Sequence, residues 1–117
     1  MVQPEADTVS AQHFFDIDIR VGQVLECERF AEARRPAYRM VIDLGELGER
    51  RSSARLTDNY TPEELVGTLV VAVVNLPARQ IGPLRSEVLV LGAYQHGTDA
   101  VTLLRPDGDC RPGDRIG

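Results

Sequence analysis

The stretch Leu69–Gly92, which reads LVVAVVNLPARQIGPLRSEVLVLG, decides how the rest of the chain is organised. Its apolar runs Leu69–Val74 and Val88–Leu91 are rich in Val and Leu and too short for typical buried helices, so each predicts a strand. The segment between them contains two prolines and a glycine, which exclude a regular helix or a central strand. Polar side chains on a loop held between two rigid strands can form a binding surface, although a solvated connection is the simpler interpretation.

The segments outside this stretch also predict short strands separated by turns. Strict alternation over Ile17–Val21 predicts a half-buried strand, and Gly22 predicts a bulge or a sharp bend before the strand continues to Cys27. Thr61-Pro62-Glu63-Glu64 has the pattern of a capping box with proline at the first helical position, which predicts a brief helix ending at Gly67. The remaining expected elements are a helix at Ala11–Phe15 capped by Ser10, and strands at Tyr38–Leu44, Arg51–Leu56, Leu69–Val74, Val88–Ala93 and Ala100–Leu104.

Together these elements predict the fold class. Five or six short strands, one inserted helical turn and a bent first strand indicate an all-β protein with an OB-fold, a five-stranded Greek-key barrel with short helices. A chain of 117 residues has the length of one domain. We expect a flexible N-terminus over residues 1–9 and the OB-fold domain over residues 10–117.

Composition narrows the classes of partner and compartment. The net charge of −5 argues against a protein wrapped in nucleic acid, but it leaves room for a local basic face. All 13 basic residues are arginines, so every cation can make planar, bidentate contacts with carboxylate or phosphate. The first residues lack the apolar segment of a signal peptide, and no apolar run reaches the ~20 residues of a membrane span. We therefore expect a cytoplasmic protein without membrane insertion, its two cysteines reduced.

Catalytic and metal-binding motifs are absent from the sequence. It contains no nucleophile elbow, phosphate-binding loop or zinc-ligand spacing. The carboxylate pairs Asp16 with Asp18 and Glu26 with Glu28 are each more typical of a solvated strand face than of an acid–base pair. His96 has no serine or cysteine nucleophile obviously paired with it. We expect a protein that is not an enzyme and has no catalytic residues, metal site or cofactor.

Two binding classes remain open on the residues alone. The face of an OB barrel can bind nucleic acid through basic and stacking aromatic side chains. The same loops could instead hold an extended polypeptide, with apolar patches for its side chains and polar groups for its backbone. The residues that would serve nucleic-acid binding are Arg51, Arg55, Arg79, Arg85, Tyr38 and Tyr94.

The run Asp18-Ile19-Arg20-Val21-Gly22 resembles the opening signature of the tRNA-binding-domain superfamily. The chain resembles its CsaA group most closely, since it has Ser53-Ala54 and Ser86-Glu87-Val88 where the tRNA binders tend to have Ser-Gly and Ser-x-Gly-Met. Pro83 stands where the family loop usually has glycine, so we expect a differently shaped loop there. The other matching residues are Phe30, Glu32-Ala33-Arg34, Pro36-Ala37, Ile42-Asp43, Gly45, Ser52, Val73-Val74-Asn75, Leu89–Gly92 and Arg115-Ile116-Gly117.

The resemblance implies a function as well as a fold. Residues 10–117 would form a tRNA-binding-type OB-fold domain, and two copies would form a homodimer with help from the N-terminal helix and the C-terminal tail. The CsaA group implies an export-related molecular chaperone that binds unfolded or presecretory polypeptides. The wider superfamily implies the alternative, a structure-specific tRNA-binding protein. No cofactor is implied.

The loop after Val74 is the predicted ligand site, repeated in each subunit. Ile81 and Leu84 are expected to bury an apolar side chain of the ligand, while Arg79 and Arg85 hold its carbonyl or carboxylate groups. A loop held between two strands loses less entropy on binding, so its contacts contribute more fully to affinity. The complete predicted set is Asn75, Arg79, Ile81, Leu84, Arg85, Ser86 and Glu87.

Overall fold

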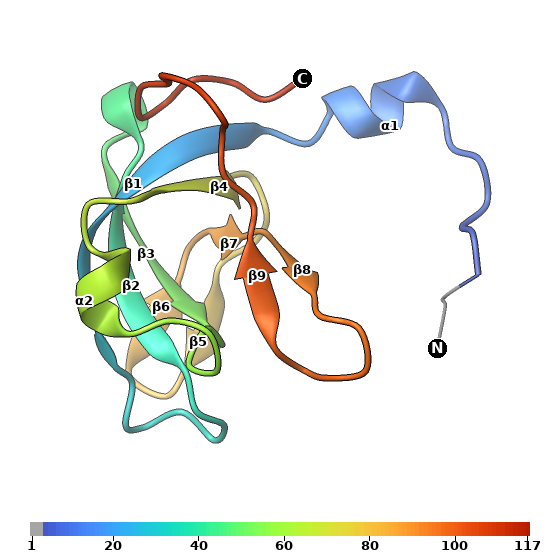
Figure 1. Cartoon of the computed structure of the whole chain (residues 1–117). Coiled ribbons are helices and arrows are strands. Elements are labelled where there is room, and N and C mark those ends of the chain that lie inside the picture. Colours follow the sequence, from blue (N-terminus) through green and yellow to red (C-terminus); the bar gives the residue numbers. More distant parts are fainter. Residues whose placement is uncertain (1–3) are drawn as a thin grey trace.

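Strand β1 (Ile19–Arg29) runs through the middle of the main sheet of the computed structural model, which describes residues 4–117 (Figure 1). The sheet is antiparallel, with strand order β3-β2-β1-β4-β7. The chain crosses from β3 to the other side of β1 through α2, which is a Greek-key connection. The other elements are α1 (Ala11–Phe15), β2 (Tyr38–Asp43), η1 (Gly45–Leu47), β3 (Glu49–Ala54), α2 (Pro62–Leu65), β4 (Leu69–Val73), β5 (Arg79–Ile81), β6 (Leu84–Ser86), β7 (Leu89–Val90), β8 (Gly92–Tyr94) and β9 (Val101–Leu103).

The sheet curls into a nearly closed barrel, which confirms the predicted five-stranded OB-fold. Closure occurs between β3 and the segment that links β6 to β7. The Glu87 N–H donates to the Arg51 carbonyl at 2.8 Å, and the Ser52 hydroxyl donates to the Val88 carbonyl at 2.9 Å. Because Ser52 is fully buried, this bond satisfies a polar group inside the barrel wall.

The core follows from the alternation in β2. Tyr38, Met40 and Ile42 point inward and are almost fully buried, whereas the residues between them face outward. The phenol of Tyr38 donates to the Tyr60 carbonyl at 2.7 Å. Tyr38 therefore belongs to the core and offers no surface on which a nucleic-acid base could stack.

Strand β1 changes neighbours along its length. Its first half pairs with β4 on one edge and with the C-terminal tail on the other, where Arg20 bridges to Arg115. Its second half pairs with β2. At Gly22 a bulge or a sharp bend was predicted; the register shift lies further along, between Val24 and Glu26, so a bulge at Gly22 itself was wrong in position. Gly22 serves close packing instead, because a Cβ there would lie 2.5 Å from Cγ2 of Ile42.

Replacing Gly22 with alanine is therefore expected to lower the free energy of unfolding by about 1–3 kcal/mol, the usual cost of overpacking a core. Gly108→Ala is the matched control, since a Cβ at Gly108 meets no atom within 4 Å. Denaturant titration of both variants measures the difference. Equal stability of the two variants would show that Ile42 moves aside without cost.

The segment Val88–Ala93, expected as one strand, is divided between two sheets. Leu89 and Val90 pair with β4, while Gly92–Tyr94 pairs with β9. Between them the Leu91 N–H donates to the Val71 carbonyl at 2.8 Å, so the chain turns away from the barrel at this point. Apolar content alone did not reveal this change of partner, because each half has the residues of a strand.

The segment Arg79–Ser86 is also more regular than expected. It forms an isolated two-stranded hairpin, β5–β6, with Gly82 and Pro83 at its turn. Gly82 has φ of +54°, a value that glycine adopts readily and that suits the first turn position of a hairpin. Proline then follows at a turn position that needs no N–H for the ladder. The exclusion of a central strand was correct, but the hairpin was missed.

The two helices differ in how they are held. Helix α2 has the predicted capping box: the Thr61 hydroxyl accepts from the Glu64 N–H, and the Glu64 carboxylate accepts from the Thr61 N–H. Helix α1 has the predicted bounds, but Ser10 makes no side-chain cap bond. In residues 4–117 no helix is long and apolar enough to cross a membrane.

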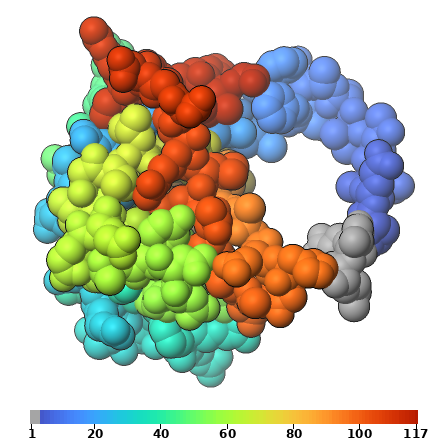
Figure 2. Space-filling model, viewed as in Figure 1, coloured from blue at the N-terminus to red at the C-terminus, as the bar shows by residue number. Residues whose placement is uncertain are grey.

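Residues Pro4–Asp16, here called the N-terminal arm, stand away from the barrel (Figure 2). Pro4–Ser10 form neither helix nor strand, and no residue of α1 is buried. The expected flexibility of residues 1–9 stays a prediction, and residues 1–3 lie outside the described part of the chain.

Candidate functional site

The β5–β6 hairpin is positioned by the loop that joins β1 to β2. A Cβ at Gly82 would lie 3.6 Å from the Glu32 Cβ and 4.0 Å from the Phe30 ring, so the hairpin tip packs on this loop. Its second strand lies along β3, where the Ser53 N–H donates to the Ser86 hydroxyl at 3.1 Å. The hairpin thus forms a wall beside the outer face of β1, β2 and β3.

A groove of about 380 Å³ lies between this wall and the strands, and we call it the β2 groove. A second hollow of about 350 Å³ continues it along the same strands. The two hollows share Glu26, Val41 and Arg51. The groove is lined by Glu26, Glu28, Arg39, Met40, Val41, Arg51, Pro83 and Leu84, and its continuation adds Glu49, Arg50 and Glu87.

Charges of both signs surround an apolar strip in the groove. Arg39 forms an ion pair with Glu28 across the β1–β2 pair. Within residues 4–117, Glu26 and Arg51 make no ion pair of their own. Val41 lies between them, because it pairs with Glu26 on one side and with Arg51 on the other. A ligand that crosses the strands at Val41 would therefore meet one carboxylate, an apolar contact and one guanidinium in sequence.

The predicted site residues of the hairpin lie together, but they do not share one role. Leu84 lines the groove and is only 8% exposed, so much of its side chain packs inward. Ile81, its cross-strand partner, is half-buried. Arg79 and Arg85 are exposed on opposite strands of the hairpin. Of these four residues, Leu84 lies in the groove wall, and Arg79 and Arg85 lie on the solvent-exposed surface of the hairpin.

Ser86 and Glu87 have side chains that are already engaged. The Ser86 hydroxyl accepts from the Ser53 N–H, and the Glu87 carboxylate accepts from the Arg51 N–H at 2.9 Å. Both bonds replace backbone pairing at the edge of β3 and help to close the barrel. These two residues consequently hold the hairpin base in place, and Glu87 also borders the continuation of the groove.

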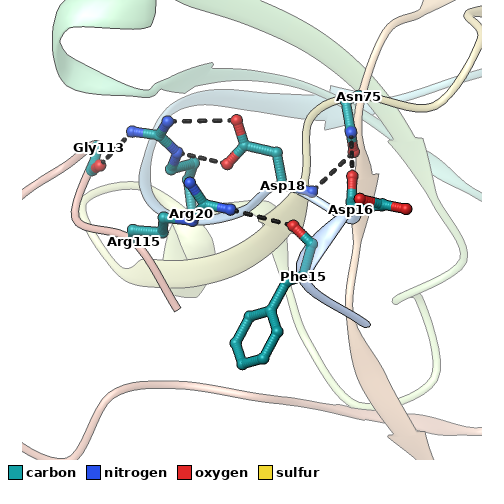
Figure 3. Close-up of polar contacts among 7 residues, drawn as sticks. All are labelled: Phe15, Asp16, Asp18, Arg20, Asn75, Gly113 and Arg115. Atoms are coloured by element: carbon teal, nitrogen blue, oxygen red, sulfur yellow. Dashed lines mark hydrogen bonds and ion pairs between the residues drawn. The ribbon is translucent and has the colours of Figure 1, made fainter. Parts of the chain in front are cut away.

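Asn75 lies at a different part of the barrel, where β1 begins. Its amide donates to the Asp16 carbonyl at 2.8 Å and accepts from the Asp18 N–H at 2.8 Å (Figure 3). Neither hollow of the groove includes Asn75 among its lining residues. The tertiary structure therefore separates Asn75 from the rest of the predicted set.

Sequence reasoning missed most of the groove floor. Glu28, Arg39 and Val41 are absent from the predicted set, although the alternation in β2 already places Arg39 and Val41 on the outward face. Glu26 and Glu28 were expected to form only a solvated pair, and Arg51 was expected to serve only nucleic acid. The sequence did contain one signal for a binding surface: Val41 is an apolar residue on the outward face of a strand, where a charged or polar residue is more usual.

Arginines gather at the end of the barrel that carries the hairpin tip. The β-ladder places the end of β1, the start of β2 and the end of β3 side by side, and the hairpin packs on the loop between the first two. Within residues 4–117 only Arg39 among these arginines forms an ion pair. This arginine pole contains more than half of the 13 arginines of the chain: Arg29, Arg34, Arg35, Arg39, Arg55, Arg79 and Arg85.

An apolar surface occupies the other end of the sheet. Ile19, Val71 and Val73 form a second buried cluster on the outer face of β1 and β4, partly covered by Leu91 and Ile116. Exposed apolar side chains occur on α1, on the segment that leads from it into β1, and at Leu89, which pairs with Val73 of the cluster. They are Phe14, Phe15, Ile17 and Leu89, and we call this surface the apolar end.

A polar network joins the start of β1 to the C-terminal tail at this end. Arg20 donates to the Asp18 carboxylate at 2.6 and 3.2 Å and to the Gly113 carbonyl at 3.1 Å (Figure 3). The hydrogen bond from Arg20 lowers the pKa of the Asp18 carboxyl, against a smaller opposing effect of burial, and the charges of Arg20 and Arg115 lower it further. The Asp-Ile-Arg motif is thus a structural connection between the two chain ends.

The remaining reactive groups include two free cysteines, Cys27 and Cys110. Within residues 4–117, no three His, Cys, Asp or Glu side chains are grouped so that they could hold a metal ion. Burial raises the pKa of the Cys27 thiol to about 11, with added effects of Glu63 and Glu28. Cys27 is therefore protonated at neutral pH and is a poor nucleophile.

Comparison with known proteins assigns the fold to a family. Residues 19–115 match the tRNA binding domain family. The chain belongs to this family and is of the CsaA type. It is 42% identical to the chaperone CsaA of Bacillus anthracis str. Ames, with a TM-score of 0.89 over 95% of this chain and 100% of that one. The CsaA chaperone protein of Picrophilus torridus is 46% identical, with a TM-score of 0.87 over 94% of this chain and 100% of that one.

Curated relatives of this CsaA-type chain include much longer proteins. The methionine–tRNA ligase of Cupriavidus necator is 35% identical over 119 residues, which cover 99% of this chain and 17% of the ligase. The chain thus spans about a sixth of the length of the ligases that it matches. The shared part is their appended tRNA-binding domain, while the rest of each ligase has no counterpart in the 117 residues.

Proposed function

We propose that the protein is a non-catalytic, cytoplasmic chaperone that binds unfolded or presecretory polypeptides in the β2 groove. The observation that carries this proposal is the mixed charge around Val41. Glu26, Glu28 and Glu49 lie along the groove and would repel the phosphates of a nucleic acid. A polypeptide offers apolar side chains, backbone amides and charges of both signs, which match the surface. The CsaA chaperones that resemble the chain support the same class of ligand.

Titration at two salt concentrations tests this proposal. The purified protein is titrated with a permanently unfolded, carboxymethylated polypeptide and, separately, with tRNA. Polypeptide bound mainly through apolar burial should keep its affinity as salt rises, because screening weakens only exposed charge contacts. If the polypeptide does not bind at the low or at the high salt concentration, the proposed function is refuted.

The arginine pole favours a second candidate function, binding of structured tRNA. Its guanidinium groups surround the loop between β1 and β2 and the hairpin, which are the loops that OB folds use for oligonucleotides. The family match over residues 19–115 supports this candidate as well. Arg39 belongs to both the pole and the groove, so the two ligands would compete at that residue.

If tRNA binds at the arginine pole, Arg79→Gln and Arg85→Gln should each lower the slope of log affinity against log salt by about one unit. Each substitution removes one phosphate contact, and the number of released counterions falls accordingly. Arg111→Gln is the control, because Arg111 is exposed but lies on the tail segment outside the pole. Slopes that fall equally in all three variants would mean that tRNA affinity depends only on the net charge of the protein, which would contradict a site at the arginine pole.

We also propose that two copies associate through the apolar end. The rings of Phe14 and Phe15 pack edge to face with their centroids 5.4 Å apart, yet the two side chains are 41% and 55% exposed. Ile17 follows them in the chain and is exposed as well, as is Leu89 at the same end of the sheet. A two-fold interface would bury this surface together with the arm and the tail. A stable interface of this kind buries at least ~1,000 Å² in total.

A further inference from the structure

The direction of the N-terminal arm is held by polar contacts rather than by packing. No residue of α1 is buried, so apolar contacts within the chain do not hold the helix against the barrel. The carbonyls at the end of a helix lack partners within it. Here the Phe15 carbonyl accepts from the Arg115 guanidinium at 3.3 Å, and the Asp16 carbonyl accepts from the Asn75 amide at 2.8 Å (Figure 3).

Asn75 makes the more specific of these two contacts. Its oxygen accepts from the Asp18 N–H at 2.8 Å while its nitrogen donates to the Asp16 carbonyl, so one amide spans the junction between α1 and β1. The Val74 N–H donates to the Asp18 carbonyl at 2.9 Å and fixes the same junction to the end of β4. With both sides of the Asp16–Asp18 turn held, the arm leaves the barrel in one direction.

We infer that Asn75 is a positioning residue for association: it presents Phe14 and Phe15 of the arm to a second copy of this chain. The inference rests on the proposed homodimer. Without the Asn75 amide, the junction loses its hydrogen bonds at the Asp16 carbonyl and the Asp18 N–H and keeps the bond from the Val74 N–H, so the arm is held less firmly. The arm then has to be ordered during association, and that ordering costs affinity.

Sedimentation equilibrium of Asn75→Ala tests the inference. The dimer dissociation constant should rise about tenfold, the effect of losing the two side-chain hydrogen bonds. Asn59→Ala is the matched control, because Asn59 is also exposed and its amide donates to the Val101 carbonyl at 2.9 Å, away from the arm. An unchanged dissociation constant in Asn75→Ala would overturn the inference.

A double-mutant cycle with Phe15→Ala separates positioning from a loss of barrel stability. If Asn75 acts through the arm, Asn75→Ala should raise the dissociation constant much less in the Phe15→Ala background than in the wild type. Full additivity of the two effects would contradict a positioning role.

The same measurements distinguish failure of this inference from failure of the proposed dimer and ligand. A monomeric wild-type protein would refute the dimer and the inference with it. A dimeric wild type with a neutral Asn75→Ala change would refute the inference alone. Polypeptide affinity per chain should be unchanged in Asn75→Ala, since Asn75 does not line the β2 groove.

Discussion

Replacing both Phe14 and Phe15 with alanine is expected to raise the dimer dissociation constant at least a hundredfold, by about 3 kcal/mol or more. The two rings are 41% and 55% exposed in the single chain, so about half of their surface remains to be buried by a partner. A two-fold dimer contains both rings twice, which doubles the loss. Their removal should cost little fold stability, because no residue of α1 is buried.

Sedimentation equilibrium and thermal unfolding together check this result. Val66→Ala is the control, since Val66 is also exposed but follows α2 on another part of the barrel. A double variant that stays dimeric at micromolar concentration would place the interface elsewhere. A double variant that unfolds would show that the arm stabilises the barrel itself.

Replacing Val41 with glutamate is expected to weaken polypeptide binding at least tenfold, which corresponds to about 1.4 kcal/mol. Val41 is the half-buried apolar residue shared by both hollows of the β2 groove. A carboxylate there removes the apolar contact and must be desolvated when a ligand covers it. It would also stand directly opposite Glu26, and this repulsion adds a modest cost to the fold.

Val41→Thr is the matched control for shape, because threonine keeps the branched side chain and adds one hydroxyl. It should retain most of the affinity for an unfolded polypeptide in fluorescence titration. If Val41→Glu binds the polypeptide as tightly as the wild type, the groove is not the binding surface. Leu84 is less suitable for this test, because it is only 8% exposed and a charge there would disturb the packing of the barrel.

Features that depend on neighbouring residues could be predicted well from the sequence. The capping box of α2 forms as expected because Thr61 and Glu64 satisfy each other within one turn. The alternation in β2 placed Tyr38, Met40 and Ile42 on one face for a similarly local reason, since successive side chains of a strand point to opposite faces.

Features that depend on which strand a segment pairs with were predicted less accurately from the sequence. Gly22 signalled an irregularity in β1, but the register shift occurs at Val24–Glu26 and Gly22 is required by contact with Ile42. The run Val88–Ala93 looked continuous, yet its halves pair with β4 and β9. In both places the deciding contact comes from another strand, which the local pattern of residues does not identify.

The sequence by itself determined the class of fold, most strand segments, both short helices and the family to which the chain belongs. Only the tertiary structure decided what the polar residues after Val74 do. Asn75 bonds to Asp16, 59 positions away, and Ser86 bonds to Ser53, 33 positions away. The physical reason is that a side-chain amide or hydroxyl can bind a ligand or an unpaired backbone group equally well, and only the folded neighbourhood selects between them.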